Sequence, residues 1–176
     1  MAEFTIRAEN LRWIDDTQDD PDDLCLHGDC AVQFGDYSAE YQDATVSATA
    51  LMLLRALEED HTLTDSVQLI PCCGFNMYAE EDGARCLILG CPNGVDWTIQ
   101  HDGNDVVMIA PGHEDDPVRI PFAQFRDEVF RFADQIEAFY RSCSPKTEPE
   151  DEIDRAGWAA FRREWQKRRH MTYDGT

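Results

Sequence analysis

An α+β fold is predicted for this chain of 176 residues, with a mostly antiparallel sheet and helices packed on one face of it. Three observations predict it. Short segments that alternate apolar and polar residues recur through the first 120 positions, as expected for half-buried strands. Such segments follow one another closely between residues 84 and 120, which is typical of an antiparallel meander. Two long helical patterns come last, so strands and helices do not alternate as they do in a βαβ fold.

The first half of the chain contains two expected strands, one helix and one further strand. The strands are expected at residues 4–8 and 31–34, where apolar and polar residues alternate. Apolar residues recur at helical spacing over residues 46–59 and form so wide a stripe that this helix is expected to be covered on more than one side. A short strand at residues 67–70 is expected to end at Pro71.

The meander in the second half is expected to have four strands. They are predicted at residues 86–89, 95–99, 106–110 and 118–120, each with apolar residues that can face a core. Asp-Gly-Asn at residues 102–104 is a typical turn between two antiparallel strands. These strands would provide the surface on which the next helix packs.

A long amphipathic helix is expected to begin at Phe122 and end at Cys143, since apolar residues recur along it at steps of three and four. It completes an acidic α+β domain over residues 1–144. Residues 145–150 contain two prolines and two glutamates and are predicted to be a linker.

The chain is predicted to close with an amphipathic helix at residues 151–170. Trp158, Phe161 and Trp165 share one face of it, and basic residues fill its last two turns, where they favour the helix dipole. This aromatic face is expected to be covered either by its own chain or by a second copy. The protein is therefore expected to be a monomer or a homodimer formed through this helix.

The charge of the chain is very unevenly distributed. Residues 1–144 contain 29 Asp and Glu against 8 Arg and no Lys, a net charge of −21, whereas residues 145–176 are neutral with 7 acidic and 7 basic residues. A field of this sign repels nucleic acid and anionic membrane and attracts basic proteins. The expected partner is therefore a basic protein. Genomic base composition or a saline habitat would also produce an acid-rich, lysine-poor sequence.

A non-enzymatic binding protein is the function that this charge favours, acting as an inhibitor that masks a basic protein. Neither a catalytic residue nor a cofactor is predicted. The loop at residues 15–23 lacks the ligand spacing of a calcium-binding loop and is interpreted as an exposed docking surface. Its contact residues are expected to be Asp15, Asp16, Asp19, Asp20, Asp22 and Asp23.

A small metal-binding or thiol-dependent protein is the alternative, from a different class. Cys25, His27 and Cys30 could supply three ligands to a zinc ion if the chain turned back at Gly28 and Asp29. In a straight strand, however, Cys25 and His27 share a face and Cys30 lies on the other. A closed structural zinc site also needs a fourth ligand. The competing interpretation is that these are buried thiols beside a strand.

Four of the other cysteines lie in two pairs, Cys72 with Cys73 and Cys86 with Cys91. Adjacent side chains in a strand point in opposite directions, and so do side chains five positions apart. Ligation of one metal by all four is therefore not expected. With no signal-peptide pattern and no apolar run near the roughly 18 residues of a membrane span, a cytoplasmic protein with reduced thiols is expected.

Three segments of the chain resemble a family of small bacterial proteins of unknown function. They are Ile-Pro-Cys-Cys-Gly-Phe at residues 70–75, Leu-Gly-Cys-Pro-Asn-Gly-Val-Asp-Trp at 89–97 and Glu-Ala-Phe-Tyr-Arg-Ser at 137–142. The resemblance extends over most of the chain and implies no activity and no functional residue. In its size, acidity and predicted fold class the chain is also similar to the immunity proteins of bacterial toxin systems, which implies an inhibitor of a protein partner.

Overall fold

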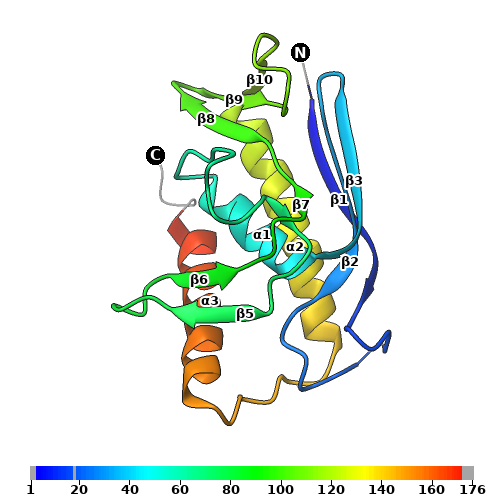
Figure 1. Ribbon diagram of the computed structural model, residues 1–176, viewed down its shortest axis with the longest axis vertical. Helices are drawn as coiled ribbons and strands as arrows, with labels where there is room; N and C mark the ends of the chain where they lie inside the picture. The colour runs from blue at the N-terminus through cyan, green and yellow to red at the C-terminus, as the bar shows by residue number, and fades with distance from the viewer. Residues whose placement is uncertain (1–2, 18, 172–176) are drawn as a thin grey trace.

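The chain has an α+β fold, as its sequence predicts. A computed structural model describes residues 3–17 and 19–171, with the side chain of residue 171 left out. Within these residues three helices combine with four small antiparallel sheets (Figure 1). The four sheets surround one central helix, and the two longer helices cover that helix from other sides.

The first sheet consists of three antiparallel strands in the order β1-β2-β3. They are β1 (Phe4–Arg12), β2 (His27–Phe34) and β3 (Tyr37–Thr45). The first two strands match the sequence prediction and extend it. The third strand is not anticipated, because it lies at an edge of the sheet and its side chains are not buried until its last two residues.

Helix α1 (Val46–Arg55) forms the centre of the molecule. All ten of its residues are buried, which explains the wide apolar stripe in the sequence. It contacts α2, α3, β2 and the short strand β4 (Ile70–Pro71). The helix ends four residues earlier than predicted, and the last of its buried residues is charged, Arg55.

The meander is shorter than predicted. Its three strands are β8 (Thr98–Asp102), β9 (Asp105–Ile109) and β10 (Val118–Pro121), in the order β10-β9-β8. The predicted strand at residues 86–89 exists as β6 (Cys86–Leu89), but it pairs with β5 (Asn76–Ala79) in a separate hairpin.

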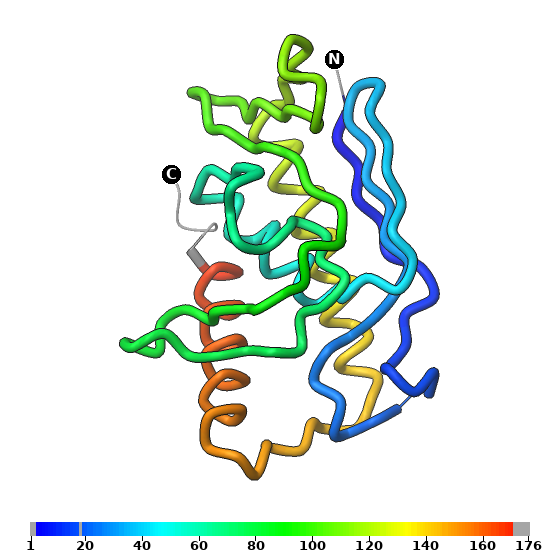
Figure 2. The backbone as a smooth tube through the Cα atoms, viewed as in Figure 1, coloured from blue at the N-terminus to red at the C-terminus, as the bar shows by residue number. Residues whose placement is uncertain are grey.

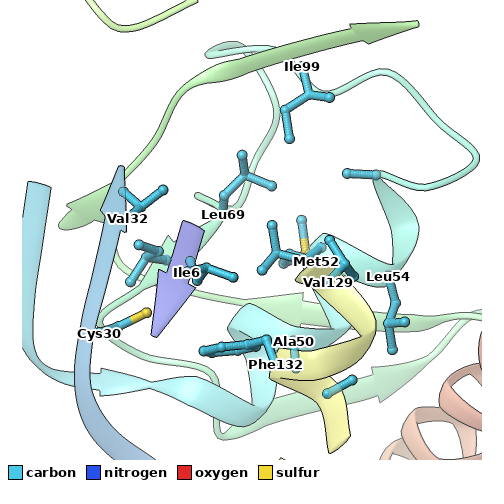
Figure 3. Close-up of a cluster of buried hydrophobic side chains, with 14 of the residues drawn as sticks. Ile6, Cys30, Val32, Ala50, Met52, Leu54, Leu69, Ile99, Val129 and Phe132 are labelled. Atoms are coloured by element: carbon cyan, nitrogen blue, oxygen red, sulfur yellow. The ribbon is translucent and has the colours of Figure 1, made fainter. Parts of the chain in front are cut away.

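Helix α2 (Phe122–Ser142) packs on α1 and β1 and also contacts β9 and β10. The expectation that it packs on the sheet of residues 86–120 is therefore confirmed only in part, because α1 and the first sheet supply a large share of the surface that it covers. Figure 3 shows Val129 and Phe132 of α2 beside Ala50 of α1 in the core. The smooth trace in Figure 2 shows α2 running along the length of the molecule.

Helix α3 (Glu152–Met171) lies against the β5-β6 hairpin and α1 of its own chain (Figure 1). Trp158 and Phe161 are buried in a second apolar cluster with Leu51, Cys86 and Ile88. Trp165 is half-buried, and its Nε1 donates a hydrogen bond of 2.7 Å to Glu137 of α2. The aromatic face therefore has a covering surface within one chain.

Gly157 allows α3 to lie directly on β5, because a Cβ atom at this position would be 2.0 Å from the carbonyl oxygen of Met77. An Ala in place of Gly normally stabilises a helix interior by about 1 kcal/mol. Here Gly157→Ala must push α3 away from β5, so we expect the free energy of unfolding to fall by about 1–3 kcal/mol. Urea denaturation measures this change.

The exposed neighbour Ala156 provides the control for this prediction. Ala156→Ser should change the free energy of unfolding by no more than about 0.5 kcal/mol. A Gly157→Ala protein that is more stable than the wild type would contradict the close packing of α3 on β5.

Candidate functional site

In the acidic loop, described over residues 15–17 and 19–23, carboxylates bind neighbouring backbone groups and Ser144. The carboxylate of Asp23 accepts hydrogen bonds from the backbone amides of Ile14, at 2.8 Å, and Cys25, at 2.9 Å. Asp19 accepts bonds from the backbone amide and the hydroxyl of Ser144, and these bonds lower the pKa of Asp19. These two acids therefore have structural partners and are less free to contact another molecule.

The same loop binds the start of the predicted linker. The amino group of Lys146 donates a hydrogen bond to the backbone oxygen of Asp20 and lies 3.0 Å from the centre of the Trp13 ring. The amide of Thr147 donates to the backbone oxygen of Pro21 at 2.9 Å. Figure 2 shows this segment and the linker meeting at one end of the molecule. The linker therefore follows a defined path along the loop.

The remaining predicted acids differ in their surroundings. Asp15 accepts hydrogen bonds from Thr17, which lower its pKa, and Asp16 forms an ion pair of 3.2 Å with Arg12. Asp22 is exposed, and no ion pair to its carboxylate is found among the described residues. The six predicted contact residues are thus not equivalent, and Asp22 is the best placed to meet a partner.

An acidic groove of about 540 Å³ lies where the loop, the linker, β5 and the start of α3 come together. In the described part of the chain, its walls contain five carboxylates and no Lys or Arg. The lining residues are Asp22, Asp23, Leu24, Cys25, Phe75, Asn76, Met77, Thr147, Glu148, Pro149, Glu150 and Asp154. Sequence reasoning identified two of these acids but not the other three, which belong to the linker and to α3.

The acidic groove also has an apolar part. The Phe75 side chain is 55% exposed, although an aromatic ring is usually covered, whereas Met77 and Cys25 beneath it are buried. Among the described residues, Glu148 is the one groove acid with an ion-pair partner, Arg162 at 2.7 Å. The groove therefore combines negative charge with an accessible aromatic ring.

The proposed ligand set Cys25, His27 and Cys30 does not come together. Cys25 belongs to the cluster beneath α3, whereas Cys30 faces the main core between the first sheet and α2. Burial raises the pKa of the Cys25 thiol, and it raises that of Cys30 to about 12, so neither forms a thiolate readily. As a metal site this set is a wrong prediction, and its cysteines act as small core residues.

A different set of cysteines does come together. Cys72, Cys73 and Cys91 are the only three His, Cys, Asp or Glu residues in the described part of the chain whose ligand atoms all lie within 4.8 Å of one another. Cys72 and Cys91 form a disulfide, and all three side chains are half-buried. Cys86 lies elsewhere, buried beneath α3.

Two short pairings create this cysteine cluster. Strand β4 pairs with β7 (Gly94–Val95), and the amide of Cys72 donates a hydrogen bond of 3.3 Å to the backbone oxygen of Asn93. Gly94 is needed for this approach, since its φ of 145° disfavours other residues and a Cβ there would lie 2.4 Å from the Ile70 oxygen. The turn before β7 therefore carries Cys91 to Cys72.

The expectation that Cys72 and Cys73 point apart is wrong, because it assumes a strand. Strand β4 ends at Pro71, and the two cysteines lie in the bend that follows, where side chains do not alternate. Their sulfur atoms are 3.3 Å apart. Proline before the pair and glycine after it are the signals that could have indicated a bend.

His61 is a buried histidine that sequence reasoning did not select. Its Nε2 lies 2.7 Å from Asp96 and its Nδ1 lies 3.3 Å from Asp65. Asp96 also accepts a hydrogen bond from the amide of Leu69. Since a carboxylate faces each ring nitrogen, the histidine links its loop to the segment between β7 and β8 and offers no free nitrogen to a substrate.

A second hollow, of about 560 Å³, lies between α2 and α3. Its floor contains Trp158 and Phe161, and Arg141, Arg162 and Arg169 are among the residues around it. These arginines form ion pairs with Glu137, Glu148 and Asp134, so their charges are balanced within the chain and the hollow is mainly an apolar surface.

Comparison with protein-family models, curated proteins and solved structures gave no match for this chain. Among the described residues, no helix combines the length and the apolar character that crossing a membrane requires.

Proposed function

We propose that this chain is a non-enzymatic binding protein whose acidic groove recognises a basic protein, in the manner of an immunity or antitoxin-like inhibitor. The observation that carries the proposal is the lining of the groove, with five carboxylates, an exposed Phe75 and no basic residue. The proposal keeps Asp22 as a contact residue and adds Glu148, Glu150 and Asp154, while Asp23 contributes charge to the groove wall but is bonded to the backbone of Ile14 and Cys25.

Both the net charge of the chain and the residues that line the groove would contribute to binding a basic partner. The net charge of −21 would attract a basic partner over about one Debye length and speed its association. Within the groove, Lys or Arg side chains of the partner would meet carboxylates, and Arg could also stack on the Phe75 ring. Aromatic residues, Phe among them, are enriched at protein–protein interfaces relative to the rest of the surface.

The same charge opposes nucleic acid and anionic membrane as ligands, because their phosphates would meet the carboxylates. The aromatic face of α3 has its covering surface in its own chain, which favours a monomer over a swapped dimer. We therefore propose a monomer that pairs with one basic protein.

Capture of the partner from a lysate of the native cells tests this function. We expect the immobilised wild-type protein to retain a basic protein that elutes at high salt. A variant with Asp22→Asn, Glu150→Gln and Asp154→Asn should retain at least about tenfold less of it, since tenfold corresponds to only 1.4 kcal/mol of binding free energy.

A variant with the same change in net charge outside the groove is the control. Glu40→Gln, Asp115→Asn and Asp116→Asn remove three exposed carboxylates from other parts of the surface. This variant should retain the partner nearly as well as the wild type does. Equal loss in both variants would mean that net charge alone causes capture, and undiminished capture by the groove variant would exclude the groove.

A further inference from the structure

The three sulfur atoms of Cys72, Cys73 and Cys91 form a compact triangle. The sulfur of Cys73 lies 3.3 Å from that of Cys72 and 3.5 Å from that of Cys91. The side chains are half-buried, so small solutes can reach them. No other cysteine of the described residues belongs to this group, which therefore offers three soft ligands at one place on the surface.

The position of Cys73 does not favour thiol–disulfide exchange. Exchange requires the attacking sulfur to lie along the S–S axis. In that position the attacking sulfur would be about 2 Å farther from one sulfur of the disulfide than from the other, because the S–S bond is about 2 Å long. Cys73 is instead almost equally distant from the two sulfurs of the disulfide. It lies beside the bond, where all three sulfurs can face a common point.

Such a common point suits a metal ion. Tetrahedral zinc with Zn–S bonds of about 2.3 Å holds its sulfur ligands about 3.8 Å apart. The two distances from Cys73 are within about 0.5 Å of this value. Only Cys72 and Cys91 must separate, and they are free to do so once the disulfide is reduced.

We propose that the reduced protein binds a zinc ion through the thiolates of Cys72, Cys73 and Cys91. A small-molecule thiol supplies the two electrons: two of its molecules become one disulfide, and the Cys72–Cys91 bond becomes two thiols. Three thiols then release three protons as Zn²⁺ binds. The fourth position of the ion is open to water or to a ligand from another molecule.

The backbone on both sides of the cysteine cluster packs closely against the core. Gly74 lies so close to α1 that a Cβ atom on it would be 2.6 Å from the Cβ of Ala48. Gly94 is equally confined against Ile70. Both chain segments that carry the ligands are thus fixed on the core, which limits the ordering that metal binding would require.

Zinc titration of the full-length chain without a metal-binding tag, after reduction, tests the proposal. A chromophoric chelator competes for the metal, and we expect one zinc ion per chain. Cys73→Ser should weaken binding at least about tenfold, since even changes beyond the ligands cost 10- to 100-fold. Cys143→Ser is the control, because Cys143 is also half-buried but lies at the end of α2, and it should bind as the wild type does.

Cobalt substitution in the wild-type protein provides a measurement that does not depend on how the variants fold. Three thiolates should give an intense sulfur-to-cobalt charge-transfer absorption, and circular dichroism checks the fold of each variant. The proposal is overturned if the reduced wild type binds no zinc, or if folded Cys73→Ser binds it unchanged. Absence of the charge-transfer absorption from a cobalt-loaded protein would overturn it equally.

Discussion

Truncation after Ser144 is expected to leave a chain that does not fold stably. The truncation removes α3, and with it Trp158 and Phe161 from the second apolar cluster. Burying one large apolar side chain contributes about 1.5–3 kcal/mol. The truncation also removes Glu164, the α3 residue that pairs with the buried Arg55. These losses together approach the 5–15 kcal/mol that usually stabilises a whole domain.

Thermal melting and the yield of protein in the supernatant after expression measure this effect. The wild type should melt cooperatively, and the truncated chain should show no transition or should aggregate. Lys167→Ala, an exposed change in α3, is the control and should change the melting temperature little. A truncated chain that melts at the wild-type temperature would show that α3 is not part of the fold.

The fold class could be predicted because each signal for it is local. Alternation along β1 and β2 and helical spacing along α1, α2 and α3 are properties of neighbouring residues, so one sequence displays them. The width of the stripe on α1 even indicated that this helix is covered on several sides. Strand β3 was not predicted, because few of its side chains are buried.

Pairing between distant segments could not be predicted in the same way. Strand β6 has the alternation of a meander strand, yet it joins β5 because α3 covers that hairpin. Nothing in residues 86–89 alone distinguishes these two arrangements. The apolar stripe of α2 likewise predicts that this helix packs against another surface. The stripe does not indicate that α1 and β1 supply most of that surface.

The candidate sites illustrate the same limit. Asp22 and Asp23 were identified from their charge, but the groove exists only because the linker and α3 bring three more carboxylates to them. The cysteine cluster depends on a two-residue pairing between β4 and β7, which is too short to leave a pattern. Cys25 and Cys30 are close in sequence but face different apolar clusters.

Glu164 is the residue whose replacement should destabilise the chain most among single changes of charged groups. It is 2% exposed and accepts two hydrogen bonds from Arg55, one from Arg168 and one from the backbone amide of Cys86. These contacts join α3 to α1 and β6. Glu164→Gln leaves Arg55 buried without a counter-charge, which typically costs about 3–5 kcal/mol.

The cost of Glu164→Gln should depend on pH. Burial alone would raise the pKa of Glu164, but the hydrogen bonds and charge of Arg55, aided by Cys86 and Arg168, hold it below its usual range. A lowered pKa in the folded state means that the carboxylate stabilises the fold above about pH 4.3, the value for an unfolded Glu. This contribution is lost as the pH falls through the lower pKa of the folded state.

Urea denaturation at several pH values between about 7 and about 3 tests both parts of this prediction. The difference in the free energy of unfolding between the wild type and Glu164→Gln should be about 3–5 kcal/mol near neutral pH and should shrink below about pH 4.3. Glu81→Gln, at an exposed carboxylate, should differ little from the wild type at any of these values. A difference below about 1 kcal/mol at neutral pH, or one that stays constant on acidification, would mean that the ion pairs of Glu164 do not hold α3 to α1.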